Sequence, residues 1–254
     1  MSSAWNGFWF DRKGDAPVFF VLKLGYDGDM PRGPRCCPAG TVFHCLNRAV
    51  TRLTLFEKEG DYIAFETVLE EAWERTPIRI LDYVVMPNHW HFVLWPETDT
   101  EVTEFLRWLT NTHTMRWHAH YGTSGTGHLY QGRFKSFPVE SDEHLYTLLR
   151  YVQRNPVRAE LVERVEQWRY GSAWRREHGK AADRKLLSTW PIPRSRTWLE
   201  YANEPQSEAE LDAIGNSVRR GAPFGSPSWI SQTAARLSLG DTLRPRGRPK
   251  KQRS

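Results

Sequence analysis

The chain has few cysteines and no long apolar run. Three of its 254 residues are cysteines, Cys36, Cys37 and Cys45. An odd number of thiols, two of them adjacent, suits neither a disulfide framework nor the spacing of a zinc site. We therefore expect a reduced, cytoplasmic protein. No stretch reaches the roughly 18 apolar residues that a transmembrane helix requires, and residues 1–14 lack the pattern of a signal peptide. We expect no membrane partner.

Acidic residues are absent from the end of the chain. Residues 244–254 carry six Lys/Arg and no Asp or Glu, and without them 29 basic residues stand against 30 acidic ones. A tail of this composition cannot bury a core, so we expect it to be disordered by itself. Its Arg246-Gly247-Arg248 pattern is similar to an AT-hook, which predicts that Arg246 and Arg248 bind the minor groove of DNA. The alternative is a tail that only increases solubility.

Residues 105–139 also contain no Asp or Glu. Arginine and lysine are interleaved there with aromatic residues. Aromatic rings stack on unpaired bases at roughly 1–3 kcal/mol each, while cations track the phosphates. We interpret this stretch as a surface for single-stranded DNA, and expect most of its tryptophans to belong to the core. The expected DNA-binding residues are Arg133, Lys135, Tyr130 and Phe134.

Hydrophobic periodicity predicts an alternating order of strands and helices. The order is strand, helix, strand, strand, helix, strand, followed by a third helix with a polar cap. Such an order predicts an α+β, ferredoxin-like split βαβ fold, with an antiparallel sheet and helices on one face. The expected strands are 41–48, 78–86, 89–95 and 134–139, and the expected helices are 57–75, 103–121 and 141–155.

Two histidines flank one tryptophan in the strand 89–95. Side chains alternate across a strand, so His89 and His91 share a face and form half of a metal site. Tyr151 and Asn155 are four residues apart on a helix and also share a face. If that helix docks beside the strand, Asn155 supplies an oxygen ligand suited to Mg²⁺ or Mn²⁺. Such an ion also coordinates a scissile phosphate, and the Tyr151 hydroxyl then faces that phosphate as the nucleophile.

Simpler interpretations exist for each of these residues. An isolated His-x-His is most often structural, and Asn155 caps a helix before Pro156 as readily as it binds a metal. Tyr146 competes with Tyr151 as the nucleophile, although only Tyr151 has an amide four residues later. His44 could also face the site from the first strand, but we expect it to be a core or surface histidine. Arg158 is expected either to clamp a phosphate or to solvate the helix end. The clustered histidines His113, His118, His120 and His128 suggest a second metal site, but surface positions are expected for them.

The two segments together resemble the HUH single-tyrosine transposases, in particular the REP-associated tyrosine transposases. The resemblance is carried by His89-Trp90-His91 and by residues 151–159, Tyr-Val-Gln-Arg-Asn-Pro-Val-Arg-Ala, with support from residues 130–136 and 170–172. It implies a ferredoxin-like palm that cleaves single-stranded DNA near palindromic hairpins. It further implies metal binding by His89, His91 and Asn155, and a 5′-phosphotyrosine intermediate on Tyr151.

From this resemblance we expect four parts in the chain. Residues 1–30 have no clear pattern, and one hypothesis is that translation begins at Met30. A catalytic domain is expected over 31–162, a helical C-terminal extension over 163–243, and the basic tail over 244–254. The expected protein is a monomer or homodimer associated with the nucleoid. A domesticated protein that binds hairpins without cutting them is the alternative, and a nuclease that uses water is a third.

Overall fold

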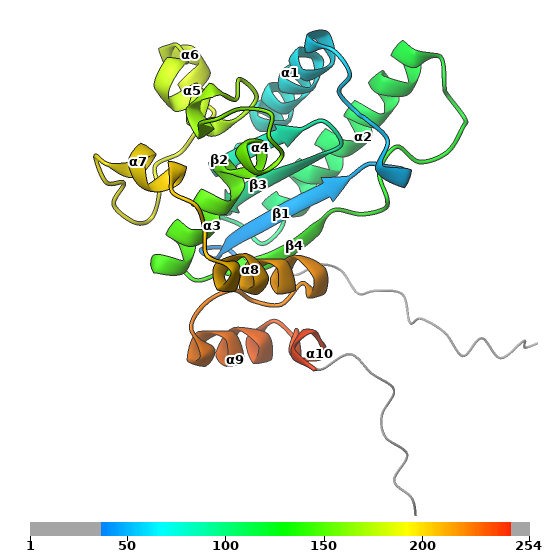
Figure 1. Ribbon diagram of the computed structural model, residues 1–254. Helices are drawn as coiled ribbons and strands as arrows, with labels where there is room; N and C mark the ends of the chain where they lie inside the picture. The colour runs from blue at the N-terminus through cyan, green and yellow to red at the C-terminus, as the bar shows by residue number, and fades with distance from the viewer. Residues whose placement is uncertain (1–36, 245–254) are drawn as a thin grey trace, which may run out of the picture. The chain divides into compact units, whose positions relative to one another are not determined.

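The fold is organised around a four-stranded antiparallel sheet in the order β2-β3-β1-β4 (Figure 1). The computed structural model describes residues 37–244, so the expectations for Met30, Arg246 and Arg248 lie outside the described residues. Turn residues Pro87 and Asn88 join β2 to β3. The strands are β1 (Val42–Arg48), β2 (Arg79–Met86), β3 (His89–Trp95) and β4 (Lys135–Val139).

Two long helices connect the strands. Helix α1 (Glu59–Arg75) joins β1 to β2, and α2 (Glu101–Tyr121) joins β3 to β4. This order and the antiparallel pairing of neighbouring strands confirm the predicted α+β, ferredoxin-like topology. Local sequence explains why the elements form, since β2 and β3 are rich in β-branched and aromatic residues, and α2 ends at Gly122 in the left-handed conformation.

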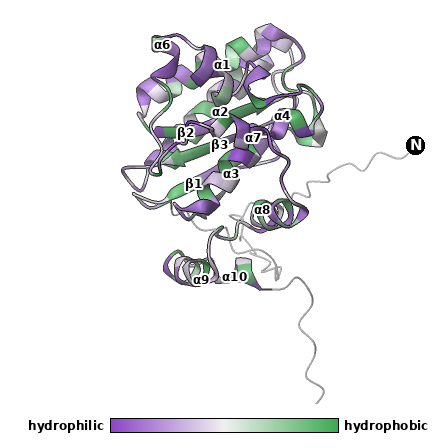
Figure 2. Cartoon of the chain, turned by 60° about the vertical axis from the view of Figure 1, so that its left-hand side comes forward, coloured by the Kyte–Doolittle hydropathy of each residue, from purple (hydrophilic) through white to green (hydrophobic). Residues whose placement is uncertain are grey.

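Helices cover both faces of the sheet, whereas the sequence predicted helices on one face. Helices α1 and α2 pack on the face that contains Phe43, Trp90 and Phe92. The opposite face contains Val42 and Val93, and it is covered by α3 (Glu143–Gln153). The two helices of the split βαβ unit thus lie on one face as predicted, and α3 adds a layer on the other face because both faces of the strands are apolar and each must be buried. Figure 2 shows the apolar strands enclosed by helices of mixed polarity.

Segments from the C-terminal half cover the two edges of the sheet. Tyr170 accepts a hydrogen bond from the Val85 backbone N–H at 2.9 Å, just before α5 (Ser172–His178). At the other edge, the backbone of Phe224 exchanges hydrogen bonds with Pro138 and Glu140, each 2.9 Å long. Covered edges cannot pair with another chain.

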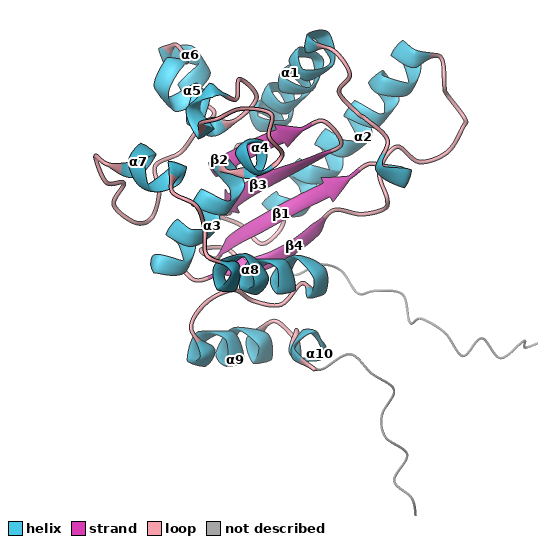
Figure 3. Cartoon of the chain, in the orientation of Figure 1, coloured by secondary structure: helices cyan, strands magenta, loops and turns pink. Residues whose placement is uncertain are grey.

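The remaining described elements are short except for α8 and α9; α4, α7 and α8 pack against α3, and α8 also packs against β4 (Figure 3). Residues 37–244 belong to one compact unit, and the predicted boundary between residues 162 and 163 stays a prediction. Among residues 37–244, no helix has both the length and the apolar character needed to cross a membrane. These elements are η1 (Val50–Arg52), α4 (Asn155–Arg158), η2 (Val165–Gln167), α6 (Ala181–Arg184), α7 (Trp198–Asn203), α8 (Glu208–Arg220), α9 (Pro227–Arg236) and α10 (Gly240–Leu243).

Candidate active site

The two histidines of β3 lie on the face of the sheet that α3 covers. Strand alternation sends His89 and His91 to this face and buries Trp90 on the other. Their ring centroids are 5.0 Å apart, with the ring planes nearly perpendicular. In the antiparallel register, Leu46 of β1 lies opposite His91 and Arg48 lies opposite His89. The strand therefore presents two imidazoles side by side, with a cationic residue next to one of them.

Tyr151 of α3 lies against this pair of rings. Its ring contacts His91 edge-on, with centroids 6.0 Å apart and an angle of 87° between the planes. The competing residue Tyr146 faces away, because its hydroxyl donates to the backbone oxygen of Pro193 and its ring packs near Trp198. Within one chain, the structure therefore brings Tyr151 to the histidines and engages Tyr146 elsewhere.

Asn155 begins α4, one turn after Tyr151. Its amide nitrogen donates to the backbone oxygens of Tyr151 at 3.0 Å and Val152 at 3.2 Å. Because carbonyl oxygens accept only from donors, these bonds fix which atom of the amide is the nitrogen. The oxygen Oδ1 then lies on the other side of the amide, where it is available as a ligand. Asn155 thus ties off the end of α3 and keeps an oxygen for a second task.

Arg158 packs on the candidate nucleophile. The centre of its guanidinium lies 4.2 Å from the centre of the Tyr151 ring, and it donates to the Tyr151 backbone oxygen at 2.9 Å. A second donor reaches Gln206 at 3.2 Å. These contacts hold the tyrosine ring in place, so Arg158 does more than solvate the helix end.

Each histidine of β3 has a neighbour at its Nδ1 atom. The Nδ1 of His89 donates to Asn88 Oδ1 at 2.6 Å, which leaves His89 Nε2 with a lone pair. The Nδ1 of His91 lies 2.9 Å from Nε2 of His44, a buried residue of β1. His44 is a core histidine, as expected, but it also contacts the site. The sequence raised a place for His44 at the site, but the core or surface interpretation was favoured.

The three imidazoles are held neutral by their surroundings. Burial lowers the pKa of His44 to about 3. Burial, together with the nearby cations Arg48 and Arg158, lowers the pKa of His89 to about 4. Burial and the neighbouring His44 and His89 also lower the pKa of His91 well below its usual range. A neutral imidazole is the form that binds a metal ion.

The predicted DNA-binding residues separate into two groups. Arg133 and Lys135 are exposed, and Lys135 lies opposite Leu46 in the β1–β4 register, on the histidine face. Tyr130 and Phe134 are 6% and 7% exposed and belong to the core under α1 and α2. The prediction that these two rings stack on bases was wrong, because alternation places the aromatic side chains on the face opposite the cations.

Arg48 is a cation that sequence reasoning missed. It is exposed at the end of β1, and it pairs in register with His89. The face of the strand on which Arg48 lies was predictable from the sequence, since Arg48 follows Val42, His44 and Leu46 at steps of two. Only the pairing of β1 with β3 shows that this face holds the histidines.

The other histidines of the sequence do not form a second site. His113 is buried, and its Nδ1 bonds to the Tyr130 hydroxyl at 2.8 Å, so it is not the surface residue that was expected. His118 contacts Thr123, and His120 contacts Lys58. In the described part of the chain, the group close enough to share an ion is Glu140, Asp142 and His144 at the start of α3.

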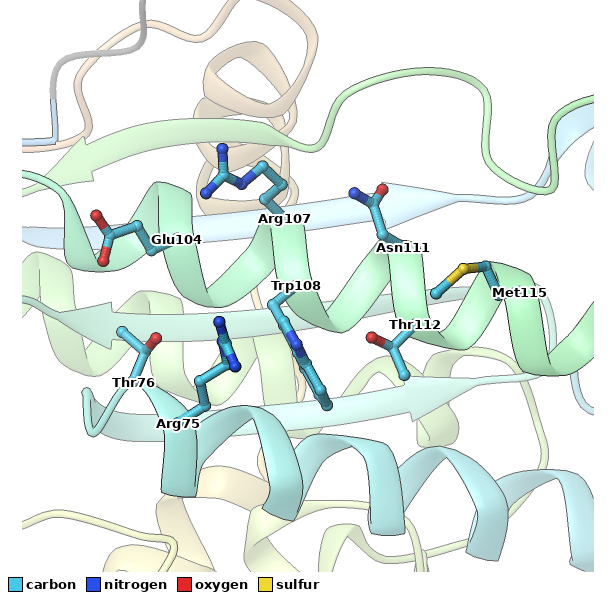
Figure 4. Close-up of a pocket in the computed structure, with 8 residues that line it drawn as sticks. All are labelled: Arg75, Thr76, Glu104, Arg107, Trp108, Asn111, Thr112 and Met115. Carbon is cyan, nitrogen blue, oxygen red and sulfur yellow. The ribbon is translucent and has the colours of Figure 1, made fainter.

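That acidic group already has structural partners. Asp142 accepts from the backbone N–H of His144 at 2.9 Å and so caps α3, and Glu140 accepts from Ser226 at 2.6 Å. A separate pocket of about 630 Å³ lies between the end of α1 and the face of α2, and Trp108 and Met115 line it (Figure 4). Because α1 and α2 cover the other face of the sheet, that pocket is not part of the histidine site.

The chain is similar to known proteins over much of its length. The sequence model of a family described as IS200-like transposases matches residues 39–155. A search of curated proteins found no match. Among solved structures, the chain is similar to a REP-associated tyrosine transposase bound to a REP hairpin, with a TM-score of 0.48 and 19% identity. That likeness covers 71% of this chain and 100% of the other.

Proposed function

Residues 39–155 match the sequence model of the IS200-like transposases, and from that premise we propose that the chain is a metal-dependent single-strand DNA endonuclease and strand transferase. The proposed nucleophile is Tyr151, and the proposed metal ligands are His89, His91 and Asn155. One observation carries the proposal: the Tyr151 ring lies edge-on to His91, with centroids 6.0 Å apart, within one chain. This arrangement supports a monomer with a complete site.

The donor set fits a divalent cation. Hydrogen bonding to Asn88 leaves the Nε2 lone pair of His89 available, and the contacts of the Asn155 amide nitrogen leave Oδ1 available. Two imidazoles and an amide oxygen, with positions left open, suit Mg²⁺ or Mn²⁺ in phosphoryl chemistry. A bound ion supplies charge that polarises the scissile phosphate.

The chain's own residues carry out the remaining chemistry. The Tyr151 oxygen attacks phosphorus as the bond from phosphorus to the 3′ oxygen breaks, which gives a 5′-phosphotyrosine and a free 3′-OH. The phenol proton is transferred away from Tyr151, and the departing 3′ oxygen receives a proton. Because the ester retains the bond energy, a different 3′-OH can reverse the step and join a new strand. The guanidinium of Arg158 stacks on the nucleophile and orients it.

Exposed cations define the proposed path of the DNA. Arg48 lies beside His89, and Lys135 lies in the same sheet row as His91 and Leu46. With Arg133 and Arg158, they would neutralise phosphates next to the site, while Arg246 and Arg248 of the tail would bind duplex DNA. We propose that the substrate is single-stranded DNA with hairpin-forming palindromes, as the sequence motifs imply.

The test is to incubate labelled single-stranded hairpin DNA with the full chain and Mn²⁺. The expected product is a protein–DNA adduct that survives denaturant. Tyr151→Phe should lose the adduct, whereas the matched control Tyr146→Phe should retain it, because Tyr146 bonds to Pro193 and faces away from the site. His89→Ala and His91→Ala should abolish cleavage and leave hairpin affinity largely unchanged, since backbone charge dominates affinity.

Other outcomes would identify a different protein. Cleavage that persists in Tyr151→Phe would indicate a nuclease that uses water. Hairpin binding by the wild-type chain without any cutting would indicate a domesticated binding protein. Loss of Mn²⁺-dependent cleavage in variants of Glu140 or Asp142, with the histidine variants still active, would place the metal in the acidic group at the start of α3.

A further inference from the structure

His44 lies on the face of β1 that holds the histidine site, diagonally opposite His91 of β3. Its side chain is fully buried, and its Nε2 lies 2.9 Å from His91 Nδ1. The two rings are stacked, with centroids 5.0 Å apart and planes 23° from parallel. A hydrogen bond between two ring nitrogens contains one proton, so the contact couples the tautomer of one ring to that of the other.

The same end of the neighbouring histidine is already fixed. His89 Nδ1 donates to Asn88 Oδ1 at 2.6 Å, which determines that His89 Nε2 is the atom with the free lone pair. Ligating histidines are commonly oriented through the ring nitrogen that does not bind the metal. Asn88 therefore does for His89 what a proton acceptor at His91 Nδ1 would do for His91.

We propose that His44 is the positioning residue whose Nε2 accepts a hydrogen bond from the Nδ1–H of His91 and so keeps His91 Nε2 as a metal ligand. The inference rests on the proposed function, because it assumes that His89 and His91 bind the cation. In this state His91 carries its proton on Nδ1 and His44 carries its own on Nδ1. Both rings stay neutral, and no proton is gained or lost by the pair relative to the opposite tautomer.

A second feature of His44 fits a role beyond packing. Its Nδ1 atom is buried and has no hydrogen-bond partner among residues 37–244. The ring lies between Phe137 and Tyr151. A phenylalanine would fill this aromatic environment without leaving a polar atom unsatisfied. Packing alone therefore does not explain a histidine at this position. A hydrogen bond accepted from His91 Nδ1–H does explain it.

The experiment compares two substitutions of His44 with a matched control. His44→Phe keeps the aromatic packing and removes the acceptor, whereas in His44→Gln the amide oxygen replaces Nε2 as the acceptor. The control is His113→Phe, another buried histidine with one ring hydrogen bond, located on the opposite side of the sheet. Mn²⁺ affinity of the full chain is measured from the electron paramagnetic resonance signal of free Mn²⁺.

We expect His44→Phe to weaken Mn²⁺ binding about 10- to 100-fold, which is typical for loss of a partner that orients a ligand. His44→Gln should restore binding to within a few-fold, and His113→Phe should leave it unchanged. ¹⁵N-histidine NMR gives a second readout that does not depend on cleavage. With saturating Mg²⁺, the His91 Nδ1 should be protonated in the wild-type chain.

Three results would overturn the inference. The first is a His44→Phe variant, folded by circular dichroism, that binds Mn²⁺ like the wild type. The second is an Nε2-protonated His91 at saturating Mg²⁺. The third is that the wild-type chain does not bind Mn²⁺ and that His91→Ala makes no difference. That result would remove the proposed metal site itself. The first two refute only the role of His44, so they are distinguishable from failure of the proposed function.

Discussion

The substitution Gln153→Leu tests how the tyrosine helix is held on its sheet. Gln153 lies two residues after Tyr151 and is buried. Its amide nitrogen donates to the carboxylate of Asp82 on β2, and its amide oxygen accepts from the Trp198 indole at 2.9 Å. One side chain thus links α3 to the sheet and to α7.

Leucine removes both bonds from a buried place. A hydrogen bond to a charged group contributes about 1.5–3 kcal/mol, and a buried donor left unpaired costs about 1–3 kcal/mol. Burial raises the pKa of Asp82 to about 6, so its carboxylate is mostly ionised near neutral pH and needs its donors. Allowing for the apolar gain from leucine, we expect a loss of about 3 kcal/mol in the free energy of unfolding.

Urea unfolding followed by circular dichroism measures this loss, and the melting temperature should fall by about 6–12 °C. Adduct formation on hairpin DNA should fall as well, at a temperature where the variant is still folded, because Tyr151 is no longer fixed beside His91. Gln167→Leu is the control, since Gln167 is exposed. A Gln153→Leu variant as stable and as active as the control would refute the reasoning.

Three further predictions concern charge and metal. Removal of Mn²⁺ and Mg²⁺ with a chelator should stop cleavage without releasing bound hairpin DNA in a gel-shift assay. Arg48→Gln should weaken single-strand binding and reduce the slope of log affinity against log salt by about 0.7, which a salt titration measures. Lowering the pH from 6.5 to 5.0 should destabilise the wild type by about 1.5 kcal/mol more than His44→Phe, by urea unfolding at each pH. The folded pKa of His44 lies below its unfolded value, so only the unfolded state takes up the proton in this range.

The strands and the long helices were predictable because their signals are local. Alternation over His89–Trp95 gives both the strand and the shared face of its two histidines. Helical spacing then places Tyr151 and Asn155 one turn apart. The docking of α3 beside the histidine strand could be stated only as a condition. The apolar residues of the face that it covers come from four separate strands.

The contacts that complete the site depend on the register between strands. His44 meets His91 only because β1 pairs with β3 in a particular alignment, and nothing in either segment alone specifies it. The error at Phe134 was avoidable, because alternation along a strand puts Arg133 and Lys135 on one face and Phe134 on the other. That other face is the core beneath α1 and α2.

The central claim is that Tyr151 becomes joined to DNA, and mass spectrometry of the adduct tests it most directly. Trypsin cuts after Arg150 and Arg154, so residues 151–154 form a peptide whose one hydroxyl is that of Tyr151, while Tyr146 lies in the peptide 136–150. After nuclease trimming of the adduct formed with Mn²⁺, the account predicts nucleotide mass on the peptide 151–154. Nucleotide mass on the peptide 136–150, or on neither peptide, would contradict it.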